Sequence, residues 1–210
     1  MRTVEIRVGD ETLRGEAIGG GAVMEPGNWS EEGNGRLTFA NGKLGIDAME
    51  GGYSAFFRGE LPGDLLLSFR ARLVPPEGAG NINIITHCQP ERAGFPISPT
   101  GAYDAYHLLP NYIVTFVKDE ERLGQSPHAG RTRLRRNPGF RLIAEAHPES
   151  AMGREYQVVF ACKAGRVRYY LDSVKLHEWL DPDPLPGGLF ALRTYKTALE
   201  CRDLLICRAL

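Results

Sequence analysis

Short stretches in which apolar and polar residues alternate one by one run through most of this sequence. Side chains of a β-strand point to opposite faces with a period of two, so each stretch predicts a strand with one buried face. Spacing typical of a helix is scarce. The plainest predicted strands are Leu65–Val74, Asn81–His87, Asn111–Lys118, Arg154–Lys163, Arg166–Asp172, Gly188–Tyr195 and Leu199–Arg208. An all-β fold follows.

Turn-forming residues separate these stretches, as a fold built of many strands requires. Asn41-Gly42 lies between the alternating stretches 36–40 and 43–47. Asn-Gly suits a two-residue turn in which both residues take positive φ, so we expect a tight hairpin there. Within the strand 65–74, the alternation assigns one set of residues to a core face (Leu65, Leu67, Phe69, Ala71, Leu73) and another to a polar face (Ser68, Arg70, Arg72).

The chain has 210 residues and shows no linker, so we expect a single domain spanning residues 1–210. Antiparallel strands in this number favour a two-sheet sandwich of the jelly-roll kind. The alternation continues to the carboxyl end, which places the last strand inside a sheet. Its removal should therefore unfold the domain.

Charge and apolar patterning narrow the function classes. A formal net charge of −1 argues against a nucleic-acid-binding surface over the whole molecule. No run of about 18 apolar residues is present, and the first nine residues lack the apolar core of a secretory signal, so we expect no membrane partner and a cytoplasmic location. The four cysteines form no CxxC pair and lie in or beside apolar stretches, which predicts reduced, buried thiols (Cys88, Cys162, Cys201, Cys207).

Three segments carry a family resemblance: 104–116, 130–140 (GRTRLRRNPGF) and 187–195 (GGLFALRTY). With the order of the predicted strands, they resemble the concanavalin A-like lectin/glucanase superfamily, and in particular its YesU-type proteins. The resemblance extends from about Gly52 to the carboxyl end. The first fifty residues match nothing in it, and the Glu-x-Asp-x-Glu strand of the retaining glucanases is absent.

This resemblance implies two curved antiparallel sheets, with polar and aromatic side chains on the concave sheet forming a carbohydrate groove. YesU-type proteins are associated with the use of pectin-derived sugars. The resemblance therefore implies an oligosaccharide ligand that contains rhamnose or a uronate.

The segment Arg131-Thr-Arg-Leu-Arg-Arg is the most unusual in composition. On a strand, Arg131, Arg133 and Arg135 share one face and repel one another unless anions lie nearby. A guanidinium offers paired donors that match the two oxygens of a uronate carboxylate. We predict Arg133 and Arg135 as binding residues; the alternative is a solvated face paired with some of the 26 acidic residues.

Arg193 and Tyr195 are predicted on the face of their strand opposite Phe190 and Leu192. An aromatic ring beside a cation suits sugar recognition, since the ring stacks on C–H groups while the charge binds hydroxyls or a carboxylate. We include both as binding residues. The alternative is a surface pair on an edge strand.

Tyr106 and His107 lie at the end of a segment, 88–106, that is rich in Pro and Gly and predicted to be a long loop. Near arginines, such a pair could eliminate across a uronide, with Arg neutralising the carboxylate and Tyr or His moving the proton. Neighbours on a strand point to opposite faces, so at most one would reach the groove. The alternative is a partly buried tyrosine and a surface histidine.

Other chemistries have weaker support. Glu145 and Asp104 are the carboxylates nearest these segments, and we do not predict them as a hydrolytic pair. The histidines have no metal-ligand spacing, and no phosphate-binding glycine loop precedes a helix, so we expect neither metal nor cofactor; calcium binding and self-association stay open. The leading hypothesis is an intracellular protein that binds, with or without cleaving, an acidic or rhamnose-containing oligosaccharide. The alternative is a non-catalytic module that binds carbohydrate or protein.

Overall fold

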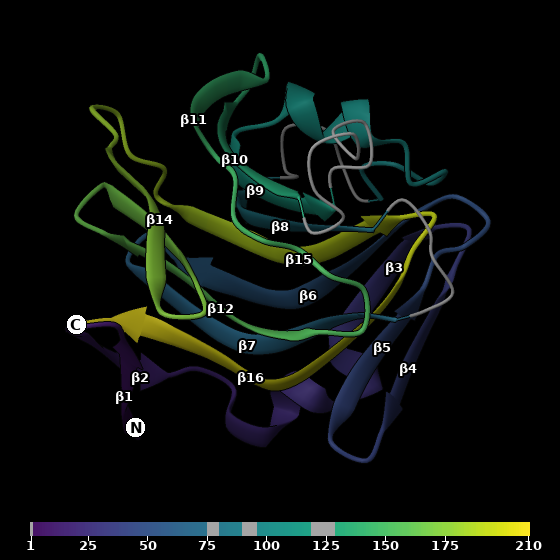
Figure 1. The fold of residues 1–210 in the computed structure, drawn as a ribbon, viewed down its shortest axis with the longest axis horizontal. Coiled ribbons are helices and arrows are strands. Elements are labelled where there is room, and N and C mark those ends of the chain that lie inside the picture. The colour runs from purple at the N-terminus through teal and green to yellow at the C-terminus, as the bar shows by residue number, and fades with distance from the viewer. Residues whose placement is uncertain (1, 75–79, 90–95, 119–128) are drawn as a thin grey trace.

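The computed structural model describes residues 2–74, 80–89, 96–118 and 129–210, which form two stacked antiparallel sheets (Figure 1). Nine strands make one sheet. Seven of them lie in the spatial order β1 (Thr3–Val8), β2 (Glu11–Ala17), β16 (Ala198–Ala209), β7 (Leu65–Val74), β12 (Glu155–Lys163), β13 (Arg166–Leu171) and β14 (Val174–Leu180), while β5 (Lys43–Asp47) pairs with β16 and with β4 (Arg36–Ala40).

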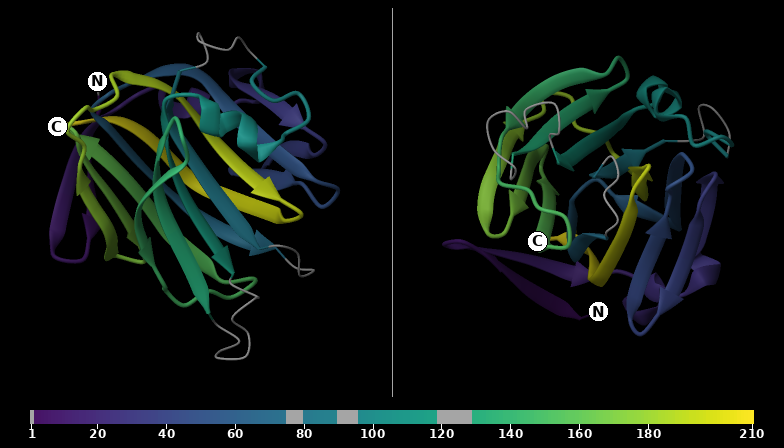
Figure 2. Two further views of the ribbon diagram at one scale, coloured as in Figure 1. Left: turned by 90° about the horizontal axis from the view of Figure 1, so that it is seen from above. Right: turned by 45° about the vertical axis from the view of Figure 1, so that its right-hand side comes forward.

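The second sheet has seven strands. Their spatial order is β11 (Arg141–Ala146), β10 (Gly130–Asn137), β9 (Asn111–Lys118), β8 (Asn81–Cys88), β15 (Gly187–Tyr195), β6 (Gly52–Pro62) and β3 (Trp29–Gly33). The two sheets bow in the same direction, so the outer face of the seven-stranded sheet is concave (Figure 1). The short 3-10 helix η4 (Tyr103–Leu108) lies over that face, as the view from above shows (Figure 2).

The predicted all-β class and the two-sheet antiparallel sandwich are confirmed. Each of the seven predicted strands is present, with ends that differ by no more than two residues. The Asn41-Gly42 hairpin is also confirmed, because Ala40 pairs with Lys43 and the two turn residues have φ of 52° and 71°. The last strand, β16, lies between β2 and β7, inside the sheet as expected.

The main core fills the space between the sheets. All five residues predicted for the core face of β7 belong to it, together with Phe190 and Leu192 from the opposite sheet. All four cysteines are buried and free of disulfides, which confirms the prediction of reduced thiols. No helix in the described part of the chain is long and apolar enough to cross a membrane.

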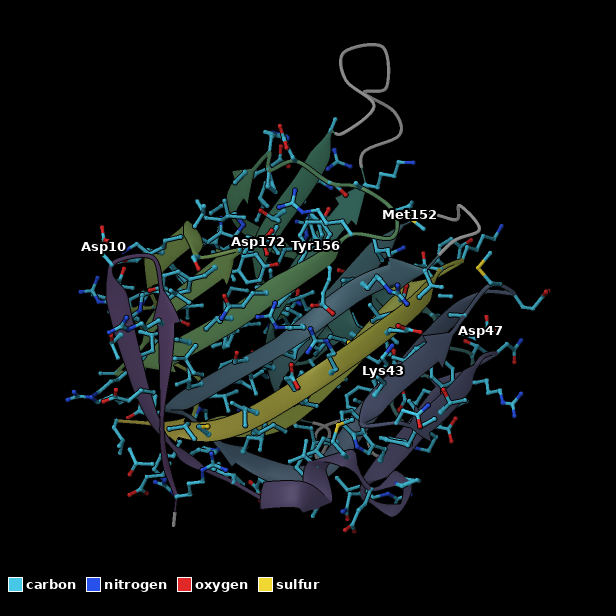
Figure 3. All side chains as sticks on the ribbon, turned by 60° about the horizontal axis from the view of Figure 1, so that its bottom comes forward. Asp10, Lys43, Asp47, Met152, Tyr156 and Asp172 are labelled. Atoms are coloured by element: carbon cyan, nitrogen blue, oxygen red, sulfur yellow. The ribbon has the colours of Figure 1, made fainter. Side chains whose placement is uncertain are left out.

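Figure 3 shows the outer face of the nine-stranded sheet. On this face Arg70 and Arg72 of β7 take part in ion pairs. Glu200 on β16 lies 2.7 Å from Arg72 and 3.2 Å from Lys43, and Arg70 pairs with Glu155 on β12. The first fifty residues, which the resemblance left unassigned, complete both sheets. Their β1–β2 hairpin covers Leu66, so the outer face of β7 is buried at that end.

A correction concerns Tyr106 and His107. Our sequence argument placed them on a strand, whereas they belong to η4, between Pro-rich segment 96–102 and β9. The change alters their geometry, since residues of a 3-10 helix turn by about a third of a circle per residue and do not alternate between two faces. Residues 90–95, in the predicted loop 88–106, lie outside the described residues, and so do residues 119–128 of a second irregular region that the sequence predicts over 119–131.

Candidate ligand-binding site

One row of polar side chains crosses the concave face of the seven-stranded sheet. Residues directly opposite each other in an antiparallel pair share a face, so the strand registers define the row. It reads, from β11 to β3, Glu145, Arg133, Thr115, Asn83, Arg193, Ser54 and Glu32. The sequence places these seven residues in seven separate strands, and only the pairing brings them into one line.

The next row along the strands is mostly apolar, apart from Arg135 and Ser30 at its two ends, and is covered by η4. It includes Ile113, Ile85, Ala191 and Phe56, which form a second small core with Tyr106 of η4. The polar row therefore lies at the edge of the covered half of the sheet, where a ligand-binding hollow can form beside a fixed wall.

Glu32 is the anchor of that wall. Its carboxylate is 2% exposed and accepts hydrogen bonds from the backbone N–H groups of Ile97 (2.6 Å) and Ser98 (3.0 Å) and from the Tyr106 hydroxyl (2.7 Å). Three donors aimed at one buried carboxylate compensate its desolvation. Glu32 thus fixes both segment 96–102 and η4 over the sheet.

Three glycines allow the same segment to approach the strands closely. Gly33 ends β3, Gly52 begins β6 and Gly101 belongs to the segment. A Cβ atom built on Gly52 would lie 2.5 Å from the Gly101 oxygen and 2.7 Å from Nη2 of Arg193, while one on Gly33 would lie 2.9 Å from Cα of Gly101. Side chains at these positions would therefore push the segment away from Arg193.

Arg193 lies between Asn83 and Ser54 in the row and is 4% exposed. Its Nη2 donates to the Gly101 carbonyl oxygen at 2.9 Å, and its guanidinium carbon lies 4.6 Å from the centroid of the Tyr103 ring. Among the described residues no carboxylate forms an ion pair with it, and its Nε has no hydrogen-bond partner there. Burial lowers the pKa of Arg193 from its ordinary value. A buried cation without an anion is costly.

A hollow of about 510 Å³ lies beside Arg193. Its other lining residues come from β6, β8, β9, β15 and segment 100–103: Gly52, Asn81, Asn83, Thr100, Gly101, Ala102, Tyr103, Thr115, Val117 and Tyr195. Pockets of this size hold small organic ligands and combine apolar walls with a few placed polar groups.

The polar groups of the hollow are held by one another. Thr115 Oγ1 donates to Asn83 Oδ1 at 2.8 Å, Asn83 Nδ2 donates to Asn81 Oδ1 at 3.1 Å, and Asn81 Nδ2 donates to the carbonyl oxygen of Tyr195 at 2.9 Å. The hydroxyl of Tyr103 lies 3.2 Å from Thr115 Oγ1. This network orients amides and hydroxyls before a ligand arrives, which lowers the entropy cost of binding.

The structure brings two of the four predicted binding residues into the hollow. Arg193 and Tyr195 both line it, and the Tyr195 side chain is 43% exposed. Their face was expected to be wet, but Arg193 is buried because Gly101 and Tyr103 cover it. Whether either residue binds a ligand stays a prediction.

The arginines of β10 share the concave face, as their register with Val117, Thr115 and Ile113 shows. Arg133 is the next cation along the polar row, and its Nε lies 2.6 Å from Oε2 of Glu145. Arg135 belongs to the covered row, where its guanidinium lies 3.8 Å from the centroid of Phe140. Arg133 therefore continues the row beyond Thr115, and Arg135 is not among the residues that line the hollow. Their binding roles stay predictions.

Tyr106 and His107 do not line the hollow. Tyr106 is fully buried, and burial together with its bond to Glu32 raises the pKa of its hydroxyl. The His107 ring stacks on Phe140 at 3.8 Å, and burial followed by the charge of Arg135 lowers the pKa of His107 to about 4. Their geometry holds η4 in place. A catalytic role for either residue stays a prediction.

No aspartate or glutamate is among the described residues that line the hollow. Asp104 is exposed on η4, and Glu145 pairs with Arg133 at the far end of the row. The described residues contain no cluster of three potential metal ligands from His, Cys, Asp and Glu.

Three residues that matter here were missed by the sequence argument: Glu32, Tyr103 and Asn83. Asn83 carried a usable signal, since the alternation in Asn81-Ile-Asn-Ile places both asparagines on the face opposite the core isoleucines. Glu32 and Tyr103 carried none, because their partners lie far away in the sequence.

Comparison with known proteins identifies the fold. None of the protein-family models matches the chain, and no curated protein matches it either. Among solved structures, a protein of unknown function with a galectin-like fold from Bacillus subtilis superposes with a TM-score of 0.69 at 16% identity, covering 100% of this chain and 99% of that one.

Two further structures of similar fold are a carbohydrate-binding module and a glucanase. The carbohydrate-binding module CBM66 from Bacillus subtilis has a TM-score of 0.62 at 12% identity, covering 86% of this chain and 95% of its own. A prokaryotic β-1,3-1,4-glucanase (lichenase) derived from a mouse hindgut metagenome has a TM-score of 0.55 at 10% identity, covering 87% and 93%. The chain thus has the two-sheet sandwich fold shared by galectin-like and concanavalin A-like proteins.

Proposed function

We propose that this protein binds an acidic oligosaccharide in the hollow beside Arg193, with a sugar carboxylate as the group that Arg193 recognises. The observation that carries the proposal is the buried guanidinium, which has no carboxylate partner among the described residues and lies at the edge of a hollow. A carboxylate supplies the missing charge and accepts paired N–H donors. The uronate-containing ligand that the YesU-type resemblance implies has this group.

The remainder of the hollow suits a sugar. Asn81, Asn83 and Thr115 present amide and hydroxyl groups in fixed orientations, as sugar hydroxyls require. Tyr195 presents an exposed ring on which the C–H face of a pyranose can stack. Carbohydrate-binding modules, lectins and glycosidases among the structures of similar fold support the same ligand class.

The proposal is limited to binding. Hydrolysis needs two carboxyl groups on either side of the glycosidic bond, and the described lining of the hollow supplies none. Sugar incubated with the protein should therefore give no hydrolysis products by chromatography, and the appearance of shorter saturated sugars would contradict this part of the proposal.

The test is a thermal-shift and calorimetry screen of the whole chain against oligogalacturonates and against the same sugars with every carboxyl reduced to an alcohol. A ligand that binds the native state raises its apparent stability. We expect the acidic sugars to raise the melting temperature and the reduced sugars to leave it unchanged. Equal shifts of the melting temperature with the acidic and the reduced sugars would show that Arg193 does not select the ligand. No shift with either set would contradict the proposal.

A further inference from the structure

The polar row is open at one end and closed at the other. From Arg193 towards β3 its next members, Ser54 and Glu32, are 0% and 2% exposed. Segment 97–101 covers them, held by the bonds of Glu32 and by the contact between Gly101 and Gly52. A ligand on this face therefore meets a wall directly beyond Arg193.

In the other direction, exposure increases from Asn83 onward. Asn83 is 3% exposed, Thr115 is half-buried, and the side chain of Arg133 is 31% exposed. Strands lie about 4.8 Å apart, so the row from β15 through β8 and β9 to β10 spans about 14 Å, enough for an oligosaccharide of about three units. Tyr103, whose hydroxyl lies 3.2 Å from Thr115 Oγ1, borders this half of the row, and the hollow beside it extends over Asn83, Thr115 and Val117.

The two cations of the row differ in burial in the same way. The buried Arg193 lies at the closed end, while Arg133 lies at the open end, where Glu145 and solvent already balance its charge. A carboxylate at the closed end gains more from pairing than one at the open end, because exposed ion pairs contribute little and desolvated cations need an anion.

From this arrangement we infer that the protein recognises the end of an acidic oligosaccharide chain, with the terminal carboxylate against Arg193 and the following units leaving across β8, β9 and β10. The inference rests on the proposed function and refines it. A carboxylate in the middle of a long chain cannot reach Arg193 in the same way, since the wall over β6 and β3 blocks continuation of the chain on that side.

The experiment uses isothermal titration of the full chain with trimeric galacturonate in which one carboxyl at a time has been reduced: that of the non-reducing end, the internal unit or the reducing end. We expect reduction at one of the two ends to weaken binding at least tenfold and internal reduction to weaken it less than threefold. If internal reduction is the most damaging, the chain passes through the site and the inference is wrong. The proposed function still holds in that case, because an acidic sugar binds.

A pair of variants tests the direction of the chain. Arg133→Ala removes the cation of the open end. As a control, Arg141→Ala removes an exposed arginine that lies opposite Arg136 in the register of β10 and β11, outside the polar row. Arg133→Ala should weaken the trimer several-fold and leave monomeric galacturonate unchanged, and Arg141→Ala should change neither. An unchanged trimer affinity in Arg133→Ala would contradict the proposed path. Absence of binding by every acidic sugar would contradict the proposed function itself.

Discussion

Replacing Gly52 by alanine tests how closely segment 96–102 is fitted over Arg193. The added methyl group would lie 2.5 Å from the Gly101 carbonyl oxygen and 2.7 Å from Nη2 of Arg193. Ordinary van der Waals contact begins at 3.4 Å, so the carbonyl oxygen must retreat by about 0.9 Å and the guanidinium by about 0.7 Å. Both belong to the hydrogen bond that holds the segment on Arg193.

The expected cost follows from these displacements. Overpacking of this kind destabilises a protein by about 1–3 kcal/mol. A displaced guanidinium is also misaligned with the proposed sugar carboxylate, and a charge-assisted hydrogen bond of roughly 1.5–3 kcal/mol corresponds to a loss of affinity of about tenfold or more. We therefore expect Gly52→Ala to lower both the free energy of unfolding and the affinity for an acidic sugar.

The preceding residue provides the matched control. A Cβ atom on Gly51 meets nothing within 4 Å, and Gly51, like Gly52, does not have a positive φ. Gly51→Ala should be neutral or stabilise by up to about 1 kcal/mol, through loss of freedom in the unfolded chain. Urea unfolding and calorimetry with oligogalacturonate measure the two variants side by side. Equal stability and equal affinity for the two variants would refute the proposed close fit.

Three further perturbations have defined outcomes. Glu32→Gln should destabilise the protein by about 2–3 kcal/mol in urea, because the amide cannot accept all three hydrogen bonds to the carboxylate; an unchanged midpoint would contradict its anchoring role. Leu67→Ala should cost about 2–5 kcal/mol by leaving a cavity between the sheets, and a cost below 1 kcal/mol would argue against the packed core. Burial lowers the pKa of His177 from 6.5 to about 4, so the unfolded chain binds an extra proton between these values and stability falls as pH decreases through that window. Urea midpoints at pH 7.5 and 5 should differ less in His177→Gln than in the unchanged protein, and equal differences would show that His177 does not contribute.

The strands could be predicted from the sequence because their signal is local. In 65–74 the alternation alone separates the core residues from Arg70 and Arg72, and the Asn41-Gly42 turn requires only two residues of positive φ. The same reasoning gave Arg193 and Tyr195 a shared face opposite Phe190 and Leu192. Period and turn chemistry suffice wherever neighbours along the chain decide the structure.

The site could be predicted only in part, because burial at the hollow depends on distant contacts. Gly101, which covers Arg193, precedes it by 92 residues, and Tyr106 meets Glu32 across 74 residues. Local alternation therefore predicted an exposed Arg193. In the structure Gly101 covers this residue, and its burial is the property on which the proposed function rests. Likewise, the strand pattern assumed at Tyr106 gave way to a 3-10 helix that packs on the apolar row of the sheet.

The most direct test of the central claim is a thermodynamic cycle that joins Arg193 to the ligand carboxylate. Calorimetry would measure the affinity of the unchanged protein and of Arg193→Gln for an oligogalacturonate and for its fully carboxyl-reduced counterpart, with urea unfolding to show that both proteins are folded. Our account predicts that Arg193→Gln abolishes most of the preference for the acidic sugar, with a coupling of about 2 kcal/mol or more, as expected for a buried charge pair. A preference for the acidic sugar that survives unchanged in Arg193→Gln would contradict it.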